Sequence, residues 1–425
     1  MSWLLRHRVR HYVQSSLFLA PITSIVLALL VAPVVRTIDD QTRWSLFGFG
    51  AAGASAVVSG LASSIFGLIV FSFSILLLAI QIAGGQLSPR IIARIFRTPL
   101  IRWTVALFVF TYTYSLAALG RIGDRVPQLP VALAIVFSLM SLASFLYLVQ
   151  RMGEEFRPGT VMTKMGERTR AVLDAIYPAP FTAVGGDHAS FSLDPATADR
   201  TVEHRNMSGV VLAFDARGLT ELAERSGCII ELVPEVGDFL AVGEPMFRLY
   251  GAGAGQVSET RLRDSIAIGG ERTMEQDPTF GFRIIVDIAS KALSPAINDP
   301  TTGTLAIDQI HRLLLRVSRL QLDTGVIRDS AGTVRFVYRT PDWEDFVTLG
   351  GTEIRMYGAT SPQIPRRLRA MYEQLLRAVP PERAPALRRE VELLDATIEA
   401  AYPDPRDRAL AGTSDLQGFG SRSRG

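Results

Sequence analysis

The sequence predicts a membrane α-helical domain with four transmembrane helices, followed by a cytoplasmic α+β domain. The chain has 425 residues and is 48% hydrophobic, its long apolar runs lie in the first 150 residues, and no charged residue occurs from Leu46 to Gln86. Because a helix of roughly 20 apolar residues crosses a bilayer, this uncharged run is long enough to cross it and project beyond. Backbone groups in hydrocarbon must be bonded internally, so runs this apolar are predicted to be helices.

The domain of residues 1–150 contains four predicted spans, at about residues 17–35, 61–82, 101–119 and 130–150. A small-residue extension from Ala51 precedes the second span. Thr98-Pro99 opens the third with a capping residue and a proline that has no N–H to leave unbonded. A basic N-terminus before the first run is also typical of a signal peptide. The run is long and no clear small-x-small cleavage site follows it, so we predict an uncleaved anchor.

The arginines next to the spans are concentrated in the regions that would lie on one side of the membrane. Seven of them, unaccompanied by acids, precede the first span or connect the second to the third: Arg6, Arg8, Arg10, Arg90, Arg94, Arg97 and Arg102. The other two loops carry nearly balanced charge. The positive-inside rule therefore predicts a multi-pass membrane protein with both termini in the cytoplasm.

A stripe of small or polar residues recurs every seventh position of the second span: Gly53, Gly60, Gly67, Ser74 and Gln81. Such stripes let helices approach each other closely in lipid. One interpretation is packing inside a single four-helix bundle, and the other is an oligomer seam or pore lining. No span carries an acidic or basic residue in its interior, which disfavours a charge-coupled transporter.

The connection after the second span predicts contact with lipid headgroups. Arg90, Arg94 and Arg97 would lie on one face of a short helix that begins after Ser88-Pro89. Their guanidinium groups could then meet lipid phosphates. The alternative is that these charges only set the topology.

The remaining chain is divided by composition into four segments. Residues 151–205 are predicted to be a helical connector and linker, 206–256 a small β-rich module, 257–403 a mainly helical cytoplasmic domain, and 404–425 a disordered tail. In the β-rich module, short strands separated by V-G-D-F-L and V-G-E-P-M turns resemble lipoyl and biotinyl carrier domains. No lysine lies between Lys164 and Lys291, so a swinging-arm role is excluded.

The helical domain contains the densest polar constellation of the chain: Arg272, Asp277, Asp287, Asn298, Asp299 and Thr302. Asp277-Pro278 and Asp299-Pro300 each predict the start of a helix, because the carboxylate caps free N–H groups and proline presets the backbone. These roles explain most of the polar residues, and the alternative is a ligand or ion pocket at the helix joint. Val334–Tyr338 is a predicted strand, and Gly350-Gly351 is predicted to interrupt the helix that starts at Trp343.

Two motifs, Glu271–Gly281 and Ala292–Thr302, together with the Gln86–Arg90 junction, resemble the signature of a bacterial integral membrane protein family classed as a domain of unknown function. The shared motifs are Q-L-S-P-R after the second span and A-L-S-P-x-I-N-D-P-T-T at the helix joint. This resemblance covers nearly the whole chain. It implies four spans in a bacterial inner membrane and a cytoplasmic domain, and it implies no reaction, substrate or catalytic residue.

Three classes of function follow from these observations. We favour a membrane-anchored sensor or scaffold whose cytoplasmic domain binds a protein or a small ligand. The alternative is an oligomeric channel-like protein gated by that domain, and a membrane-bound enzyme is favoured least. No motif indicates a catalytic residue, a metal site or a cofactor. The expected partners are membrane lipid, further copies of the chain, and a cytoplasmic protein or small ligand, and no nucleic acid is expected.

Overall fold

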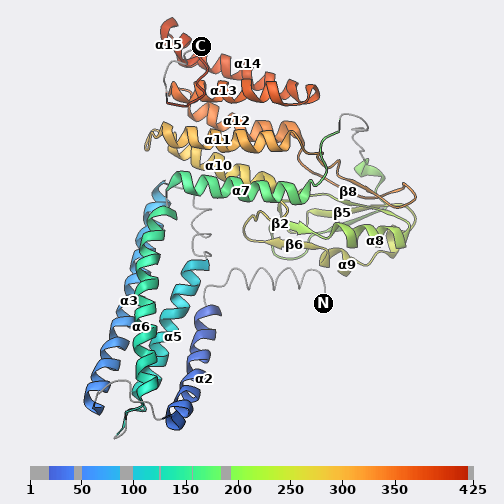
Figure 1. Ribbon diagram of the computed structural model, residues 1–425. Helices are drawn as coiled ribbons and strands as arrows, with labels where there is room; N and C mark the ends of the chain where they lie inside the picture. Colours follow the sequence, from blue (N-terminus) through green and yellow to red (C-terminus); the bar gives the residue numbers. More distant parts are fainter. Residues whose placement is uncertain are drawn as a thin grey trace. The chain divides into compact units, whose positions relative to one another are not determined.

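The computed structural model describes residues 19–42, 50–86, 99–123, 126–155, 157–182 and 193–419. These residues form two compact units, one ending at Thr160 and the other beginning at Val161. They are named here the span unit and the C-terminal unit, and each is described by itself (Figure 1).

The span unit contains four helices that are long and apolar enough to cross a membrane. They are α2 (Leu19–Thr42), α3 (Ala51–Gln86), α5 (Pro99–Leu119) and α6 (Gln128–Glu155). The prediction of four apolar helices is confirmed. Helix α3 has 36 residues. At 1.5 Å per residue this is about 54 Å, which exceeds a hydrocarbon core of about 30 Å.

Helix α2 continues beyond the predicted span through charged residues to Thr42. On this extension Asp39 is only 2% exposed, and its Oδ1 accepts the backbone N–H of Leu129 at 2.8 Å. The carboxylate thereby satisfies one of the free N–H groups at the start of α6. A hydropathy pattern ends the span at the first charge, whereas the helix continues because this charge has a buried partner.

Helix α5 packs against the other three helices of the span unit. Thr104 Oγ1 lies 3.1 Å from Ser144 Oγ on α6, and Thr111 Oγ1 lies 2.9 Å from Ser141 Oγ. Two apolar clusters form the core of the unit. One contains Ala28, Ala32, Ala54, Val58, Tyr114, Val131 and Ala134, and the other contains Leu76, Ile101, Val105, Leu148 and Met152.

The C-terminal unit contains most of α7 and a layered group of helices that follows the β strands. The helices are α7 (Pro158–Ile176), α10 (Pro278–Ala292), α11 (Pro300–Val317), α12 (Trp343–Tyr357), α13 (Gln363–Ala378), α14 (Ala384–Ala401) and α15 (Pro405–Ala411). Helix α10 packs on α11 and α12, which pack in turn on α13 and α14 (Figure 1). The predicted caps are present, since Asp277 caps α10 and Asp299 caps α11.

Glycines allow these helices to approach each other closely. A Cβ at Gly281 on α10 would collide with Thr169 on α7, and a Cβ at Gly351 on α12 would collide with the hydroxyl of Tyr372 on α13. Gly350-Gly351 was predicted to interrupt the helix, and that prediction is wrong because α12 is continuous. These two glycines serve contacts with neighbouring helices.

Two sheets accompany the helices. Their strands are β1 (Arg200–Glu203), β2 (Gly209–Phe214), β3 (Ile229–Leu232), β4 (Phe239–Leu240), β5 (Pro245–Tyr250), β6 (Ile266–Gly269), β7 (Val326–Arg328) and β8 (Val334–Tyr338). The five-stranded sheet has the order β1-β5-β3-β8-β7 and the three-stranded sheet the order β4-β2-β6. Helices α8 (Ala216–Ser226) and α9 (Glu259–Asp264) complete this region, together with three short 3₁₀ turns at Pro195–Thr197, Ala254–Gln256 and Pro381–Arg383.

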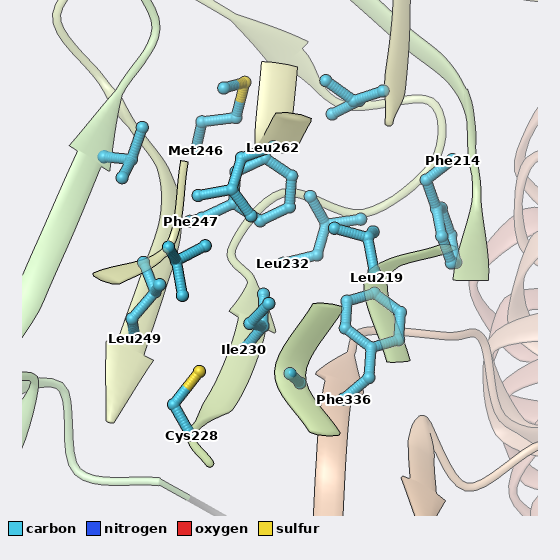
Figure 2. Packing of buried hydrophobic residues seen from close by; sticks show 14 of the residues in the cluster. Phe214, Leu219, Cys228, Ile230, Leu232, Met246, Phe247, Leu249, Leu262 and Phe336 are labelled. Carbon is cyan, nitrogen blue, oxygen red and sulfur yellow. The ribbon is translucent and has the colours of Figure 1, made fainter. Parts of the chain in front are cut away.

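Side chains from several strands and from α8 and α9 form one core between these elements (Figure 2). Ile230 of β3 lies opposite Phe336 of β8 in a parallel pair, although β8 follows α11 in the chain. The sequence predicted a β-rich module limited to residues 206–256. In the structure the β region also includes strands that precede and follow this range. The V-G-D and V-G-E turns do form, with Gly237 at φ +99° and Gly243 at φ +91°. The likeness to carrier domains is not confirmed beyond these turns.

The chain after Asp404, predicted to be disordered, contains helix α15, and turns and bends follow it as far as residue 419. Asp404 caps α15 by accepting the N–H of Arg406 at 2.7 Å. Asp415 is 2% exposed, and its Oδ1 accepts the N–H groups of Gln417 and Gly418, each at 3.0 Å. The prediction of a disordered tail is wrong for residues 405–419, because charged groups there have partners within the fold.

Candidate functional site

The first part of the predicted polar constellation lies at the start of α10. Asp277 is 3% exposed, and its Oδ1 accepts the N–H of Phe280 at 2.9 Å and the hydroxyl of Thr279 at 2.5 Å. Arg272 donates through Nε to Asp277 Oδ2 and through Nη2 to Thr279 Oγ1 at 3.1 Å. Every oxygen of this carboxylate is therefore occupied in capping the helix and binding the guanidinium.

The same segment joins the helices to the sheets. The guanidinium of Arg272 lies so close to Gly237, in the turn between β3 and β4, that a Cβ there would collide with it. The side chain of Gln276 accepts the N–H of Phe214 at 3.0 Å and donates to its carbonyl at 3.2 Å. The first family motif thus connects α10 to two β elements, which is a structural role.

Asp287 lies further along α10 and belongs to a different set of contacts. Arg283 donates through Nε to Asp287 Oδ1 at 2.6 Å, and its two terminal nitrogens bind both oxygens of Glu353 on α12. The bonds from Arg283 hold the pKa of Glu353 below its ordinary value. The arrangement is a two-pronged ion pair that ties α10 to α12.

The remaining three residues form the joint between α10 and α11. Asp299 Oδ1 accepts the N–H of Thr302 at 3.1 Å, and the N–H of Asp299 donates to Ala292 O at 2.7 Å. Asn298 has φ +49°, in the left-handed region that asparagine tolerates better than most side chains. The six predicted residues therefore divide into three local sets, each explained by caps, turns and ion pairs. No group of three or more potential metal ligands is found in the part of the chain that the structure describes.

The small-residue stripe of α3 faces outward from the span unit. Its five members, Gly53, Gly60, Gly67, Ser74 and Gln81, are all exposed. No atom of another element comes within 4 Å of where a Cβ at Gly60 or Gly67 would lie. Among the described residues, packing inside one bundle is not seen at these two glycines. An oligomer seam or pore lining stays a prediction. The predicted headgroup contacts Arg90, Arg94 and Arg97 lie outside the described residues.

Sequence reasoning missed an exposed apolar group at one end of the three-stranded sheet. Met207 is 88% exposed, Phe239 66% and Val242 58%. Phe239 pairs with Val210 of β2, and the N–H of Val242 donates to Ser208 Oγ at 3.1 Å, next to Met207. These three side chains are named here the apolar tip. The sequence signal for the tip was the presence of Phe239 and Val242 in the turn segment V-G-D-F-L-A-V-G. Whether these side chains are exposed depends on what covers the sheet, which the sequence does not show.

Acidic side chains border the apolar tip. Asp238 and Glu244 are exposed, and each carboxylate accepts one backbone N–H of its own turn, from Glu235 at 2.9 Å and from Ala241 at 2.7 Å. Burial, and after it the carboxylate of Asp238, raise the pKa of Glu235. Asp238 and Glu244 therefore place two exposed carboxylates beside the tip.

Comparison with known proteins agrees with the membrane architecture. A family model described as "Predicted membrane protein (DUF2254)" matches residues 14–374. The uncharacterized protein Rv1290c of Mycobacterium tuberculosis H37Rv is 26% identical over 424 residues, which covers 95% of this chain and 80% of the relative. The uncharacterized protein Mb1321c of Mycobacterium bovis has the same identity and coverage. No solved structure matches the chain.

Proposed function

The chain belongs to the DUF2254 family of predicted membrane proteins, and on that premise we propose that it is a membrane-anchored scaffold whose C-terminal unit binds a partner protein in the cytoplasm. The excess of arginine before the first span and between the second and third spans supports this orientation. The proposal places the binding surface at the apolar tip and gives the family motifs the task of holding the unit together.

Exposure of the apolar tip is the observation that carries this proposal. Three large apolar side chains are exposed at one end of an otherwise well-packed sheet region. Burying them against a partner would gain roughly 25 cal/mol for each Å² removed from water. Asp238 and Glu244 beside them would repel the anionic surface of a membrane. A protein with an apolar pocket and a basic rim fits this surface better.

Photo-crosslinking in cells tests the binding surface. A photoreactive residue at position 207 of the full chain should give one discrete protein adduct. Phe239→Ser should lower its yield by about tenfold, since anchor residues at the centre of an interface carry most of its affinity. Tyr357→Ser is the matched control, because Tyr357 is 53% exposed on α12, away from the tip. An adduct that persists in Phe239→Ser, or the absence of any adduct, contradicts the proposal.

The outward stripe of α3 favours a second candidate, an oligomeric channel-like protein. Small residues with open space around them permit close approach of a helix from another copy. Gly60→Leu with Gly67→Leu should then convert an oligomer in detergent to a monomer and abolish ion flux in liposomes. Ser59→Leu, which adds bulk to exposed α3 surface about 100° around the helix from the stripe, is the control. A wild-type protein that is monomeric, or silent in flux assays as an oligomer, removes this candidate.

A further inference from the structure

The last described residues display two apolar side chains from a loop that is fixed to the fold. Asp415 is 2% exposed, and its N–H donates to the carbonyl of Arg366 on α13 at 3.2 Å. Gly418 is buried, and its N–H donates to Asp415 Oδ1 at 3.0 Å. Between and after these fixed points, Leu416 is 57% exposed and Phe419 is 80% exposed. The loop therefore holds both side chains out toward solvent.

The segment Leu416–Gly425, named here the C-terminal segment, combines these apolar side chains with positive charge. Its sequence includes Arg422 and Arg424 and no acidic residue. Segments that bind anionic membranes usually carry about four to eight lysines or arginines, so two arginines are few for that role. Phenylalanine and arginine are both enriched where proteins bind each other. The composition therefore favours a protein surface with apolar and acidic groups as the binding site.

The apolar tip is a surface of this composition. Beside its exposed Phe239, the carboxylates of Asp238 and Glu244 each accept one backbone N–H through a single oxygen. Neither carboxylate forms an ion pair with an arginine or lysine in the described part of the chain. The tip thus presents apolar area and two negative charges that have no basic partner among the described residues.

Strand β4 also leaves one edge of the three-stranded sheet open, because the strand order is β4-β2-β6. The N–H of Val211 donates to the carbonyl of Asp238 at 2.9 Å, and Gly209 lies opposite Leu240. Bonded positions alternate in an antiparallel pair, so the N–H and C=O of the intervening Phe239 point away from β2. No backbone or side-chain group of the described chain bonds to them on that side. An extended segment can bind such an edge through its own backbone.

We propose that the apolar tip of one copy binds the C-terminal segment of a second copy, an inference that rests on the proposed docking role of the tip. The apolar side chains of the segment cover the tip, its arginines face the two carboxylates, and its backbone bonds to the free edge of β4. In the proposed orientation both copies hold their C-terminal units on the same side of one membrane. This arrangement raises the local concentration of each surface around the other.

Photo-crosslinking from position 207 of the full chain, followed by mass spectrometry, identifies what binds the tip. The smallest adduct should have the mass of two chains, and its linked tryptic peptide should be Ala409–Arg422. The same peptide linked within a single chain would mean that the segment binds its own copy, which overturns the proposal. An adduct with a different protein would also overturn it, while the docking role of the tip would stand. The absence of any adduct would contradict both.

Variants of the C-terminal segment test its part in the contact. Arg422→Ser combined with Arg424→Ser should lower the yield of the two-chain adduct by about tenfold, because the acidic groups then lose their partners. Phe419→Ser should lower it by a similar factor, since an exposed aromatic anchor is lost. The control combines Arg388→Ser with Arg406→Ser, which removes two exposed arginines from α14 and α15. Undiminished yield in either segment variant, or an equal loss in the control, would overturn the proposal.

A photoreactive residue at position 419 tests the contact from the other side. It should link to the tryptic peptide Ser226–Arg248 of a second chain, which contains Phe239. Labelling of lipid without any labelling of this peptide would assign the C-terminal segment to the membrane surface and overturn the proposal.

Discussion

In the described part of the span unit, side-chain hydrogen bonds between helices come from hydroxyl groups and from the carboxylate of Asp39, whereas buried arginines bind carbonyls and carboxylates in the C-terminal unit. Thr111 pairs with Ser141 across α5 and α6. Arg383, by contrast, is 6% exposed and donates to the carbonyls of Val317 at 2.6 Å and Leu320 at 2.8 Å. A buried charge is tolerated only when its hydrogen bonds are made. The C-terminal unit is therefore held by directed bonds, and the span unit mainly by the shapes of its helices.

The largest expected effect comes from removing one buried charge. Arg383→Met leaves the carbonyls at the end of α11 without their donor and removes the guanidinium stacked on Phe181 and Trp343. We expect a loss of about 3 kcal/mol in the free energy of unfolding of the C-terminal unit. Unfolding of the full chain in detergent, followed by hydrogen exchange of α11, measures it. Arg388→Met on the exposed face of α14 should change stability by less than about 0.5 kcal/mol. Equal effects would refute the comparison.

Glycine substitutions sharpen the contrast between the units. Gly351→Ala raises helix propensity but forces a Cβ onto the hydroxyl of buried Tyr372, so we expect a net loss of about 2 kcal/mol. Gly60→Ala meets open space on α3 and should not destabilise the protomer. Thermal unfolding of both full-length variants gives the result. A stabilised Gly351→Ala would mean that the helices there are not closely packed.

A pH dependence comes from Glu390 on α14, which is 4% exposed. Burial raises the pKa of this carboxyl, against the opposing influence of Arg355. A raised pKa means that the folded state binds the proton more tightly. The contribution to stability is therefore complete below the ordinary value of 4.5 and is lost as the pH rises through the raised pKa.

Glu390→Gln should remove this pH dependence, because an amide does not titrate, so its stability relative to the wild type should increase as the pH rises through the raised pKa. The hydroxyls of Tyr372 and Thr352 now donate to different oxygens of Glu390, at 3.4 Å and 3.5 Å. The amide oxygen of glutamine can accept from one of them, and its NH2 group can donate to the other. Unfolding temperatures of both proteins, compared from pH 4.5 to about 8, provide the measurement. Parallel curves for the two proteins would exclude Glu390 as the source.

The smallest expected effect is in the span unit. Thr111→Val removes the hydroxyl that pairs with Ser141 but keeps the shape of the side chain. Hydrogen bonds between membrane helices contribute about 0.6 kcal/mol on average, so the loss should be of that size. Unfolding in detergent with a denaturing surfactant measures it. A loss as large as that of Arg383→Met would mean that the two units do not differ in how they use polar groups.

Local signals in the sequence predicted the elements that depend on local physics. The four apolar helices followed from hydropathy, and the starts of α10 and α11 from Asp277-Pro278 and Asp299-Pro300. The same dipeptide signal at Asp404-Pro405 marks the start of α15. It was overlooked because the polar composition there is also typical of disorder.

Features that depend on distant contacts could not be predicted. The strand Val334–Tyr338 was recognised, but its parallel pairing with β3 requires knowledge of which segments meet. The roles of Gly350 and Gly351 depend on neighbours such as Ile310 and Tyr372, which are distant in sequence. For the same reason the sequence did not show that the six polar residues form three separate sets. Asp287, for example, is bound by Arg283, which also binds Glu353 on the distant helix α12.

Adduct formation at the apolar tip, compared with formation elsewhere on the same unit, tests the proposed scaffold most directly. A photoreactive residue at position 207 is compared in the same cells with one at position 356, since Met356 on α12 is also well exposed, at 63%. The proposal predicts a discrete protein adduct at position 207 and none of that size at position 356. The same adduct with equal yield at both positions, or none at position 207, would contradict a docking role for the tip.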